Sequence, residues 1–240
     1  LMACGTGKTL VGLWVMEEMD VKRTIVFVPS IALLRQTWQV WNQHCSTGFY
    51  SVAVCSDQRA TDTLSSSSSA AGLPPTTNPD AIAKALDVRG PIVVFSTYQS
   101  SEVVEEAIKK SGRSFDLMIA DEAHNTTSTG LSPFTRPLYD ERIPARRRLF
   151  LTGTPRIVSR RKSRRPENES YDIHSMDDSE LYGRVAYQLP FSEAIDRNLL
   201  NDYEVCVVGV NDPDIAESIR TRNLMMVEGS EIDGEELAAH

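Results

Sequence analysis

Residues 115–124 (FDLMIADEAH) constrain the fold of this chain more than any other stretch. Leu117–Ala120 form an apolar run long enough for a buried strand, and the run ends in two carboxylates, Asp121 and Glu122. Parallel strands of α/β proteins present charge to ligands at their carboxyl ends, because the open crevice of the sheet lies there. Taken alone, the same letters are equally compatible with a strand that runs into a polar turn, so the interpretation depends on the rest of the chain.

A glycine-rich loop, Gly5-Thr6-Gly7-Lys8-Thr9, precedes a helix that we expect over residues 9–19. Glycines let the backbone N–H groups of such a loop turn inward around phosphate oxygens, and the helix N-terminus attracts the same anion. We expect Lys8 to be a surface charge that reaches the β- and γ-phosphates of a nucleotide, with the Thr9 hydroxyl and Asp121 as Mg²⁺ ligands. Glu122 would then orient or deprotonate a water.

The loop departs from the full phosphate-binding pattern in two ways. That pattern has a glycine where this chain has Met2. A strand normally aims the loop, and only four residues, Leu1–Cys4, stand before Gly5. We therefore expect the N-terminal strand to be missing from this sequence.

The remaining pattern predicts an α/β fold whose mostly parallel, doubly wound sheet has helices on both faces. Trp38 and Trp41 share the apolar face of the second helix and are predicted to be core residues. Residues 56–80 are rich in Ser, Thr and Pro and are predicted to be a solvent loop. We expect strands at 24–28, 50–55, 92–96, 115–120, 149–151, 182–189 and 203–210, and further helices at 31–41, 80–86, 102–110 and 191–200.

Charge is distributed unevenly along the 240 residues, whose formal net charge is −8. Residues 142–165 carry ten Arg/Lys and no acid, whereas residues 166–240 carry 18 Asp/Glu and four Arg. The basic loop at 156–169 is therefore either a nucleic-acid contact or only a solvated loop. The four cysteines are scattered, and no apolar run has membrane-spanning length, so we expect a cytoplasmic protein without a membrane partner.

Three segments, each at a predicted strand end, carry a family resemblance. Gly5–Thr9, Asp121-Glu-Ala-His124 and Thr152-Gly-Thr-Pro155 occur in that order. They resemble motifs I, II and III of superfamily-2 DEAH-type helicases and translocases. The chain is most similar to the first motor domain of the restriction-enzyme type (type I/III subunit, UvrB-like), as in predicted phage and bacterial helicases.

The resemblance implies a RecA-like ATP-binding domain over residues 1–210. Residues 211–240 would be an acidic linker or the start of a second RecA-like domain that this sequence lacks, together with its arginine finger. ATP and Mg²⁺ are the implied cofactors. The implied site residues are catalytic Asp121, Glu122 and His124; phosphate-binding Gly5, Thr6, Gly7, Lys8 and Thr9; metal-binding Thr9 and Asp121; coupling residues Thr152, Gly153 and Thr154; and nucleic-acid-binding Ser30, Arg35, Thr97, Tyr98 and Gln99.

The leading hypothesis is an ATP-dependent DNA helicase or translocase motor, an ATP hydrolase of a restriction or phage-defence system. An arginine finger is worth about 10³–10⁵ in rate, so we expect the chain by itself to bind nucleotide better than it hydrolyses it. Two alternatives stay open: a nucleotide-gated nucleic-acid-binding module without hydrolysis, and an RNA helicase.

Overall fold

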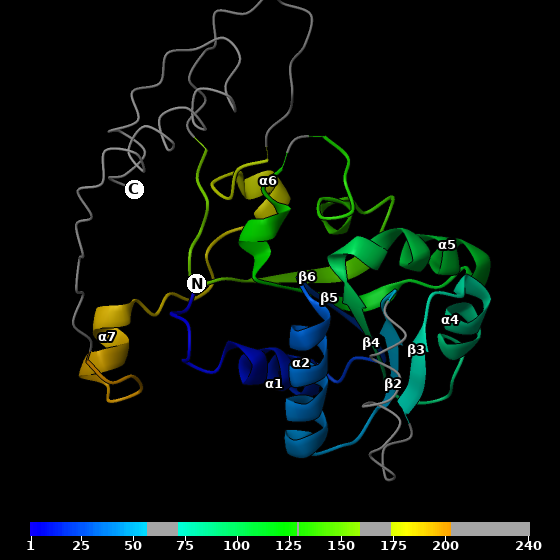
Figure 1. The fold of residues 1–240 in the computed structure, drawn as a ribbon, viewed down its shortest axis with the longest axis horizontal. Coiled ribbons are helices and arrows are strands. Elements are labelled where there is room, and N and C mark those ends of the chain that lie inside the picture. Colours follow the sequence, from blue (N-terminus) through cyan, green and yellow to red (C-terminus); the bar gives the residue numbers. More distant parts are fainter. Residues whose placement is uncertain (57–71, 129, 159–173, 203–240) are drawn as a thin grey trace, which may run out of the picture. The chain divides into compact units, whose positions relative to one another are not determined.

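A computed structural model describes residues 1–56, 72–128, 130–158 and 174–202 (Figure 1). These ranges fall in one compact unit, Leu1–Asn201, apart from Asp202. Most of the predicted basic loop, the predicted strand at 203–210 and the acidic segment 211–240 lie outside the described residues.

The fold is built on a parallel sheet, as the sequence predicted. In the part of the chain that the structure describes, six strands follow the order β3-β2-β4-β1-β5-β6, and every pair of neighbours is parallel. The central strands are buried along nearly their whole length, which explains their continuous apolar runs. The strands are β1 (Arg23–Val28), β2 (Tyr50–Val54), β3 (Gly72–Thr76), β4 (Ile92–Thr97), β5 (Phe115–Asp121) and β6 (Ala145–Leu151).

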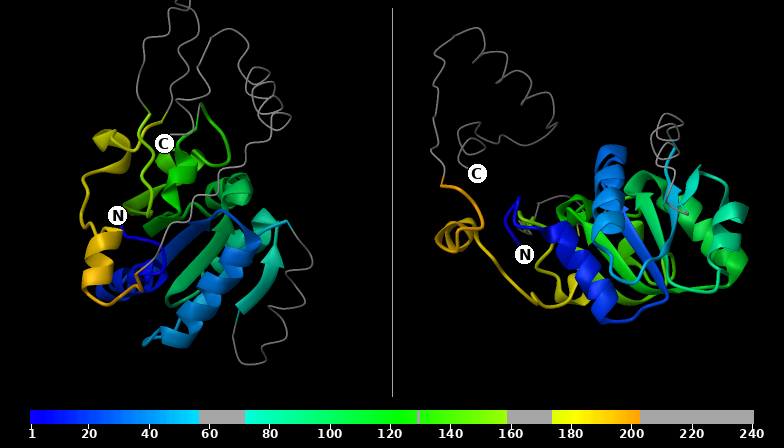
Figure 2. Two further views of the ribbon diagram at one scale, coloured as in Figure 1. Left: turned by 60° about the vertical axis from the view of Figure 1, so that its left-hand side comes forward. Right: turned by 90° about the horizontal axis from the view of Figure 1, so that it is seen from below.

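Helices cover both faces of the sheet (Figures 1 and 2). α1 (Lys8–Glu18) and α2 (Ile31–His44) pack on one face, and α4 (Pro79–Ala85) and α5 (Ser101–Ser111) pack on the other. Trp38 and Trp41 of α2 are buried, which confirms the prediction that they are core residues. The indole N–H of Trp41 also donates to the carbonyl of Thr9, so α2 is tied to the first turn of α1.

Shorter elements follow the ends of the strands. They are the 3₁₀ turns η1 (Tyr98–Ser100), η2 (Ala123–Thr126) and η3 (Arg136–Leu138), and the helices α6 (Ser179–Tyr182) and α7 (Phe191–Asp196).

Two predictions about the edges of the sheet were wrong. The segment at 56–80, predicted to be only a loop, contains β3, which pairs with β2. An edge strand needs backbone pairing on one side only, so the two prolines of β3 are tolerated. The strand predicted at 149–151 begins at Ala145, because β6 is the other edge of the sheet that the described residues form and can expose arginines there.

The predicted strand at 182–189 was also wrong. Tyr182 ends α6, Gly183 follows with φ +74°, and of this stretch only Leu189 forms a bridge, to Met2. The next helix, predicted to reach residue 200, ends at Asp196, shortly before Asn198 adopts a left-handed backbone.

The beginning of the chain lies beside these later segments. The N–H of Met2 donates to the carbonyl of Thr152 at 2.9 Å, and the N–H of Ala3 donates to the carbonyl of Leu189 at 3.0 Å. Met2, Leu189 and Ala194 form a small buried cluster of their own. These contacts aim the glycine-rich loop at the carboxyl end of β6.

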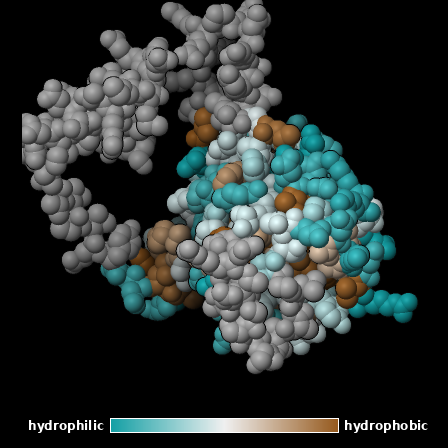
Figure 3. All heavy atoms as spheres, turned by 45° about the vertical axis from the view of Figure 1, so that its right-hand side comes forward, coloured by the Kyte–Doolittle hydropathy of each residue, from teal (hydrophilic) through white to brown (hydrophobic). Residues whose placement is uncertain are grey.

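The surface seen in Figure 3 is mainly polar, and apolar side chains appear on it singly or in small groups. Trp14, on the outer face of α1, is 55% exposed. Among the described residues, no helix is long and apolar enough to cross a membrane.

Candidate functional site

The glycine-rich loop is shaped to receive an anion. Gly5 and Gly7 have φ values of +82° and +88°, which residues with a Cβ adopt only at a cost in energy. Gly7 is also the N-cap residue of α1. Because glycine has no side chain, the cap gives the first N–H groups of the helix no side-chain acceptor. The Thr6 hydroxyl donates to the carbonyl of Ala3 at 2.7 Å and so closes the loop on its N-terminal side.

Lys8 lies inside this loop and is only 8% exposed, so the expectation of a surface charge was wrong. Its ammonium group is 3.3 Å from the carbonyl of Met2 and 3.4 Å from that of Ala3. It is also 3.9 Å from a carboxylate oxygen of Glu122. Such long contacts compensate the charge of the buried lysine only in part. Lys8 is therefore suited to bind a further anion.

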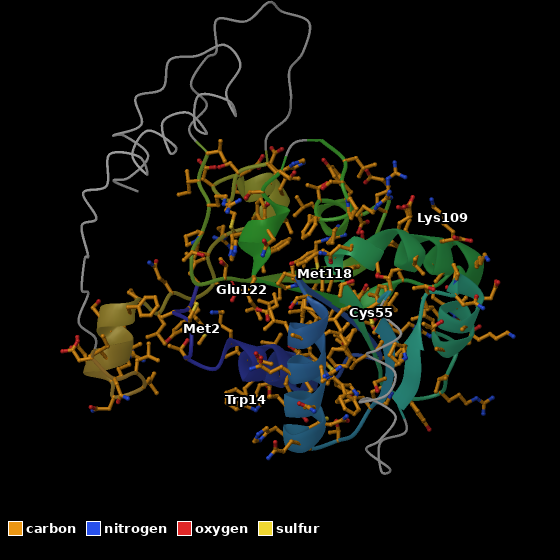
Figure 4. All side chains as sticks on the ribbon, viewed as in Figure 1. Met2, Trp14, Cys55, Lys109, Met118 and Glu122 are labelled. Atoms are coloured by element: carbon orange, nitrogen blue, oxygen red, sulfur yellow. The ribbon has the colours of Figure 1, made fainter. Side chains whose placement is uncertain are left out.

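The two carboxylates stand side by side where β5 ends. Asp121 is the last residue of the strand, and its Oδ1 accepts the N–H of Glu122 at 3.0 Å. Glu122 adopts a left-handed backbone, with φ 47° and ψ 51°, which costs a residue other than glycine about 1 kcal/mol. Figure 4 shows Glu122 beyond the end of the strand, with Met2 nearby on the loop side.

The environment of Asp121 favours a cation. Burial of the carboxyl, together with the charge of Glu122, raises the pKa of Asp121 to about 6, although the N–H of Glu122 and Lys8 act in the opposite direction. A raised carboxyl pKa stabilises the fold only at low pH, and that contribution is lost as the pH rises from 3.8 through 6. At neutral pH this carboxylate therefore costs stability, which a bound cation would restore.

His124 joins the carboxylates to the last motif. Its Nδ1 is 3.0 Å from the Thr152 hydroxyl, 3.4 Å from the Thr154 hydroxyl and 3.5 Å from a Glu122 oxygen. The Asn125 amide is 3.4 Å from His124 Nε2, an arrangement in which Nε2 accepts and Nδ1 donates. The structure thus brings together His124, Thr152 and Thr154, which are separated by 28 and 30 residues in the chain.

Gly153 of the Thr152-Gly-Thr154 turn lies close to the segment that precedes the Gly5–Thr9 loop. A Cβ at this position would lie 3.0 Å from the Met2 carbonyl oxygen and 3.3 Å from the Cys4 sulfur. The glycine lets the turn and the glycine-rich loop approach each other this closely. Thr152, next to it, is fully buried.

The five residues expected to contact nucleic acid divide into two groups. Ser30 and Gln99 are exposed at the carboxyl ends of β1 and β4, and Arg35 is half-buried on α2. Thr97 and Tyr98, by contrast, are buried inside the fold, and this part of the expectation was wrong for their side chains. The Thr97 hydroxyl donates to Ser100, and the Tyr98 hydroxyl donates to the backbone of Asp121, so neither faces solvent.

The described part of the basic stretch is partly neutralised by the fold. Arg142 pairs with Glu105, and Arg148 pairs with Asp140. Arg146 and Arg147 are exposed on β6. They line a surface hollow of about 360 Å³ at the end of the sheet opposite the glycine-rich loop.

The sequence reasoning missed two residues that support the site. The Tyr182 hydroxyl lies 2.8 Å from that of Thr126 and anchors α6 to η2, the turn that carries His124. Asn125 holds the carbonyl of Glu122 at 2.9 Å in addition to its contact with His124. The position of Asn125 directly after the motif was a usable signal, whereas Tyr182 lies 56 residues from its partner and gave none.

The donor set fits Mg²⁺ held jointly with a nucleotide. Among the described residues, no group of three or more His, Cys, Asp and Glu side chains could hold a metal ion. Mg²⁺ is commonly bound by one or two protein oxygens together with substrate phosphates. Thr9 and Asp121, beside a loop shaped for phosphate, match that mode.

Comparison with protein families places this geometry in context. The family model described as "Type III restriction enzyme, res subunit" matches residues 1–157. Two proteins named as probable helicases, from a Kenyan isolate and from the Vero-adapted Badajoz strain of African swine fever virus, are 30% and 32% identical over 227 and 209 residues. The alignments cover 92% and 86% of this chain but only 22% and 21% of those proteins.

Two solved structures are similar in fold and sequence. A nuclease-deletion mutant of the type ISP restriction-modification enzyme LlaGI, in complex with a DNA substrate mimic, has a TM-score of 0.69 at 33% identity. The ATP-dependent type ISP enzyme LlaBIII, bound to DNA, has a TM-score of 0.68 at 31% identity. They cover 85% and 94% of this chain, which spans 16% of each of theirs.

Proposed function

The chain belongs to the family of the type III restriction enzyme res subunit, and on this premise we propose that it is the ATP-binding motor domain of an ATP-dependent DNA helicase or translocase. The RecA-like fold and the restriction-type helicase motifs are those of this family. Beyond this fold and these motifs, we propose that the domain hydrolyses ATP, that its partner is DNA, and that it acts in the cytoplasm as part of a restriction or phage-defence system.

One observation carries the proposal: three segments far apart in the sequence converge where β5 ends. Lys8 approaches Glu122 from the loop at 3.9 Å, and His124 approaches both Glu122 and Thr152. Phosphoryl transfer to water depends on positioning and charge stabilisation. It requires a lysine that would bind phosphate, a pair of carboxylates and a turn that carries hydroxyl groups, and here these groups lie in contact with one another.

The residues have separable roles. The N–H groups of the Gly5–Thr9 loop and the Lys8 ammonium would hold the β- and γ-phosphates of ATP. The Thr9 hydroxyl and the Asp121 carboxylate would hold Mg²⁺, which when bound neutralises phosphate charge. Glu122 would take a proton from the attacking water, and its contacts to Lys8 and His124 keep its carboxylate directed toward the loop.

DNA is the favoured partner because both similar restriction-modification enzymes were solved with DNA or a DNA mimic. In this chain Ser30 and Gln99 are exposed at neighbouring strand ends and are suited to contact a sugar-phosphate backbone. Such contacts position a strand without reading its sequence.

Single-turnover hydrolysis, with the chain in excess over ATP·Mg²⁺, tests the proposal. We expect DNA to accelerate hydrolysis more than RNA of equal length and sequence. Glu122→Gln should retain ATP binding and lower the rate by about 10²–10⁴, the usual contribution of a general base. Hydrolysis by Glu122→Gln at the wild-type rate would remove Glu122 from the mechanism. Equal stimulation by RNA would argue against DNA as the specific partner.

A further inference from the structure

Tyr98 reaches across one strand of the sheet to another. It directly follows β4, and β1 lies between β4 and β5 in the sheet. The hydroxyl of Tyr98 nevertheless donates to the backbone carbonyl of Asp121, the last residue of β5, at 2.9 Å. The side chain therefore spans the carboxyl end of β1, beneath the edge at which the candidate site stands.

The tyrosine ring is held rigidly in this position. It is stacked between Phe27, with ring centroids 5.7 Å apart and planes inclined by 19°, and Phe134, with centroids 5.4 Å apart and planes inclined by 21°. Tyr98 is 0% exposed.

The bond fixes the peptide that joins the two carboxylates. The C=O of the Asp121–Glu122 peptide accepts from Tyr98, and its N–H donates to the Asp121 carboxylate at 3.0 Å. Both sides of one peptide are thereby held while Glu122 adopts its left-handed backbone. A rotation of this peptide would turn the Glu122 side chain away from Lys8 and His124.

The middle residue of the same turn faces solvent. Gln99, the next residue, is exposed, and its amide donates to the carbonyl of Pro29 at 3.4 Å. Pro29 precedes Ser30, whose hydroxyl caps α2 by accepting the N–H of Leu33. The turn η1 thus places an exposed polar contact and a buried contact to the carboxylates on adjacent residues.

We propose that Tyr98 is a positioning residue that couples contact with a nucleic-acid backbone at Ser30 and Gln99 to the orientation of Glu122. The proposal rests on the proposed function of the same site. A strand bound at Gln99 shifts η1, and the buried hydroxyl transmits that shift to the Asp121–Glu122 peptide. Tyr98 touches neither nucleotide nor nucleic acid, so its role is to link the two sites.

Tyr98→Phe tests this link because phenylalanine keeps the stacking and removes only the hydroxyl. The affinity of the chain for ATP·Mg²⁺ is measured by calorimetry with and without a saturating short DNA strand. The ratio of the two dissociation constants is the coupling factor, and allosteric coupling typically amounts to about 5–150-fold. In Tyr98→Phe we expect each ligand alone to bind within about threefold of the wild type, and the coupling factor to fall toward one.

A matched control is Tyr139→Phe. It removes a tyrosine hydroxyl that bonds to His174 at 2.6 Å. We expect this variant to keep the wild-type coupling factor and the wild-type stimulation of single-turnover hydrolysis by DNA, while Tyr98→Phe loses most of both.

The outcomes separate this inference from the proposed function. A wild-type chain that binds neither ATP·Mg²⁺ nor DNA contradicts the proposed function itself. A wild-type chain that binds both with a coupling factor of one overturns only the role of Tyr98. Full coupling in Tyr98→Phe also overturns it, as does failure of that variant to fold, because the hydroxyl would then serve folding alone.

Discussion

The charged cluster around Glu105 yields a quantitative prediction for Glu105→Gln. Glu105 lies on α5 with a side chain only 5% exposed, and it accepts hydrogen bonds from Lys109 at 2.6 Å, from Arg142 at 3.0 Å and from Arg136. Glutamine has nearly the same shape and lacks the charge, so it stands in for a protonated Glu105. The cluster joins α5 to the segment around η3, whose Phe134 packs against Tyr98.

The expected loss of stability in Glu105→Gln follows from the pKa of Glu105. Burial alone would raise the pKa of Glu105, but the hydrogen bonds from Lys109, Arg142 and Arg136 outweigh it and lower the pKa from 4.5 to about 2. Each pKa unit corresponds to about 1.4 kcal/mol, so the ionised carboxylate contributes about 3 kcal/mol to the free energy of unfolding at neutral pH. A lowered carboxyl pKa stabilises the fold above 4.5, and the contribution is lost as the pH falls toward 2.

Urea unfolding of the wild type and Glu105→Gln at pH 7 and pH 3 is the assay. We expect the variant to be less stable by about 3 kcal/mol at pH 7 and by about half of that at pH 3. The control is Glu106→Gln on the same helix, where the carboxylate is 56% exposed and pairs with Lys110. That change should cost less than about 1 kcal/mol at either pH. An equal loss of stability in Glu105→Gln at both pH values would refute the electrostatic reasoning.

Two further changes test the contact between the loop and the turn and the function of the basic segment. Gly153→Ala should lower the free energy of unfolding by about 1–3 kcal/mol and weaken ATP binding, because its Cβ would press on the Met2 carbonyl at 3.0 Å; an unchanged melting temperature and affinity would contradict this. Replacing the five basic residues of 160–165 by glutamine should weaken DNA binding about equally for all sequences and flatten its salt dependence, since each neutralised phosphate contributes about −0.9 to the slope of log K against log salt. An unaltered slope would identify the segment as a solvated loop.

Much of the fold followed from patterns that are local in the sequence. Continuous apolar runs predicted β1, β4 and β5, because a central parallel strand is buried on both faces and its sequence shows it. The carboxylates and the Thr152-Gly-Thr154 turn were predicted to be site elements because each follows a strand, and the glycine-rich loop because it opens a helix. In a parallel sheet all carboxyl ends meet at one edge, so the topology brings these elements together.

The errors arose where long-range contacts decide the structure. β3 exists because β2 offers it a backbone edge, and the arginines of β6 are tolerated because that strand is an edge of the sheet in the described part of the chain. Lys8 was predicted to be a surface charge because nothing in residues 5–9 indicates that its side chain folds back into the loop. Tyr98 stands next to an exposed glutamine, and only the strand order reveals that it points inward to Asp121.

Calorimetric titration of ATP·Mg²⁺ into the wild-type chain and Lys8→Ala tests the central claim most directly. We expect one site in the wild type and an affinity at least about 30-fold lower in the variant, since removing one partner of a buried charge-assisted contact costs about 2–5 kcal/mol. The variant should remain folded, because Lys8 makes only long contacts within the chain. Lys22→Ala, at the opposite end of the sheet, should bind ATP·Mg²⁺ like the wild type. Wild-type affinity in Lys8→Ala would contradict the assignment of the Gly5–Thr9 loop as the phosphate site.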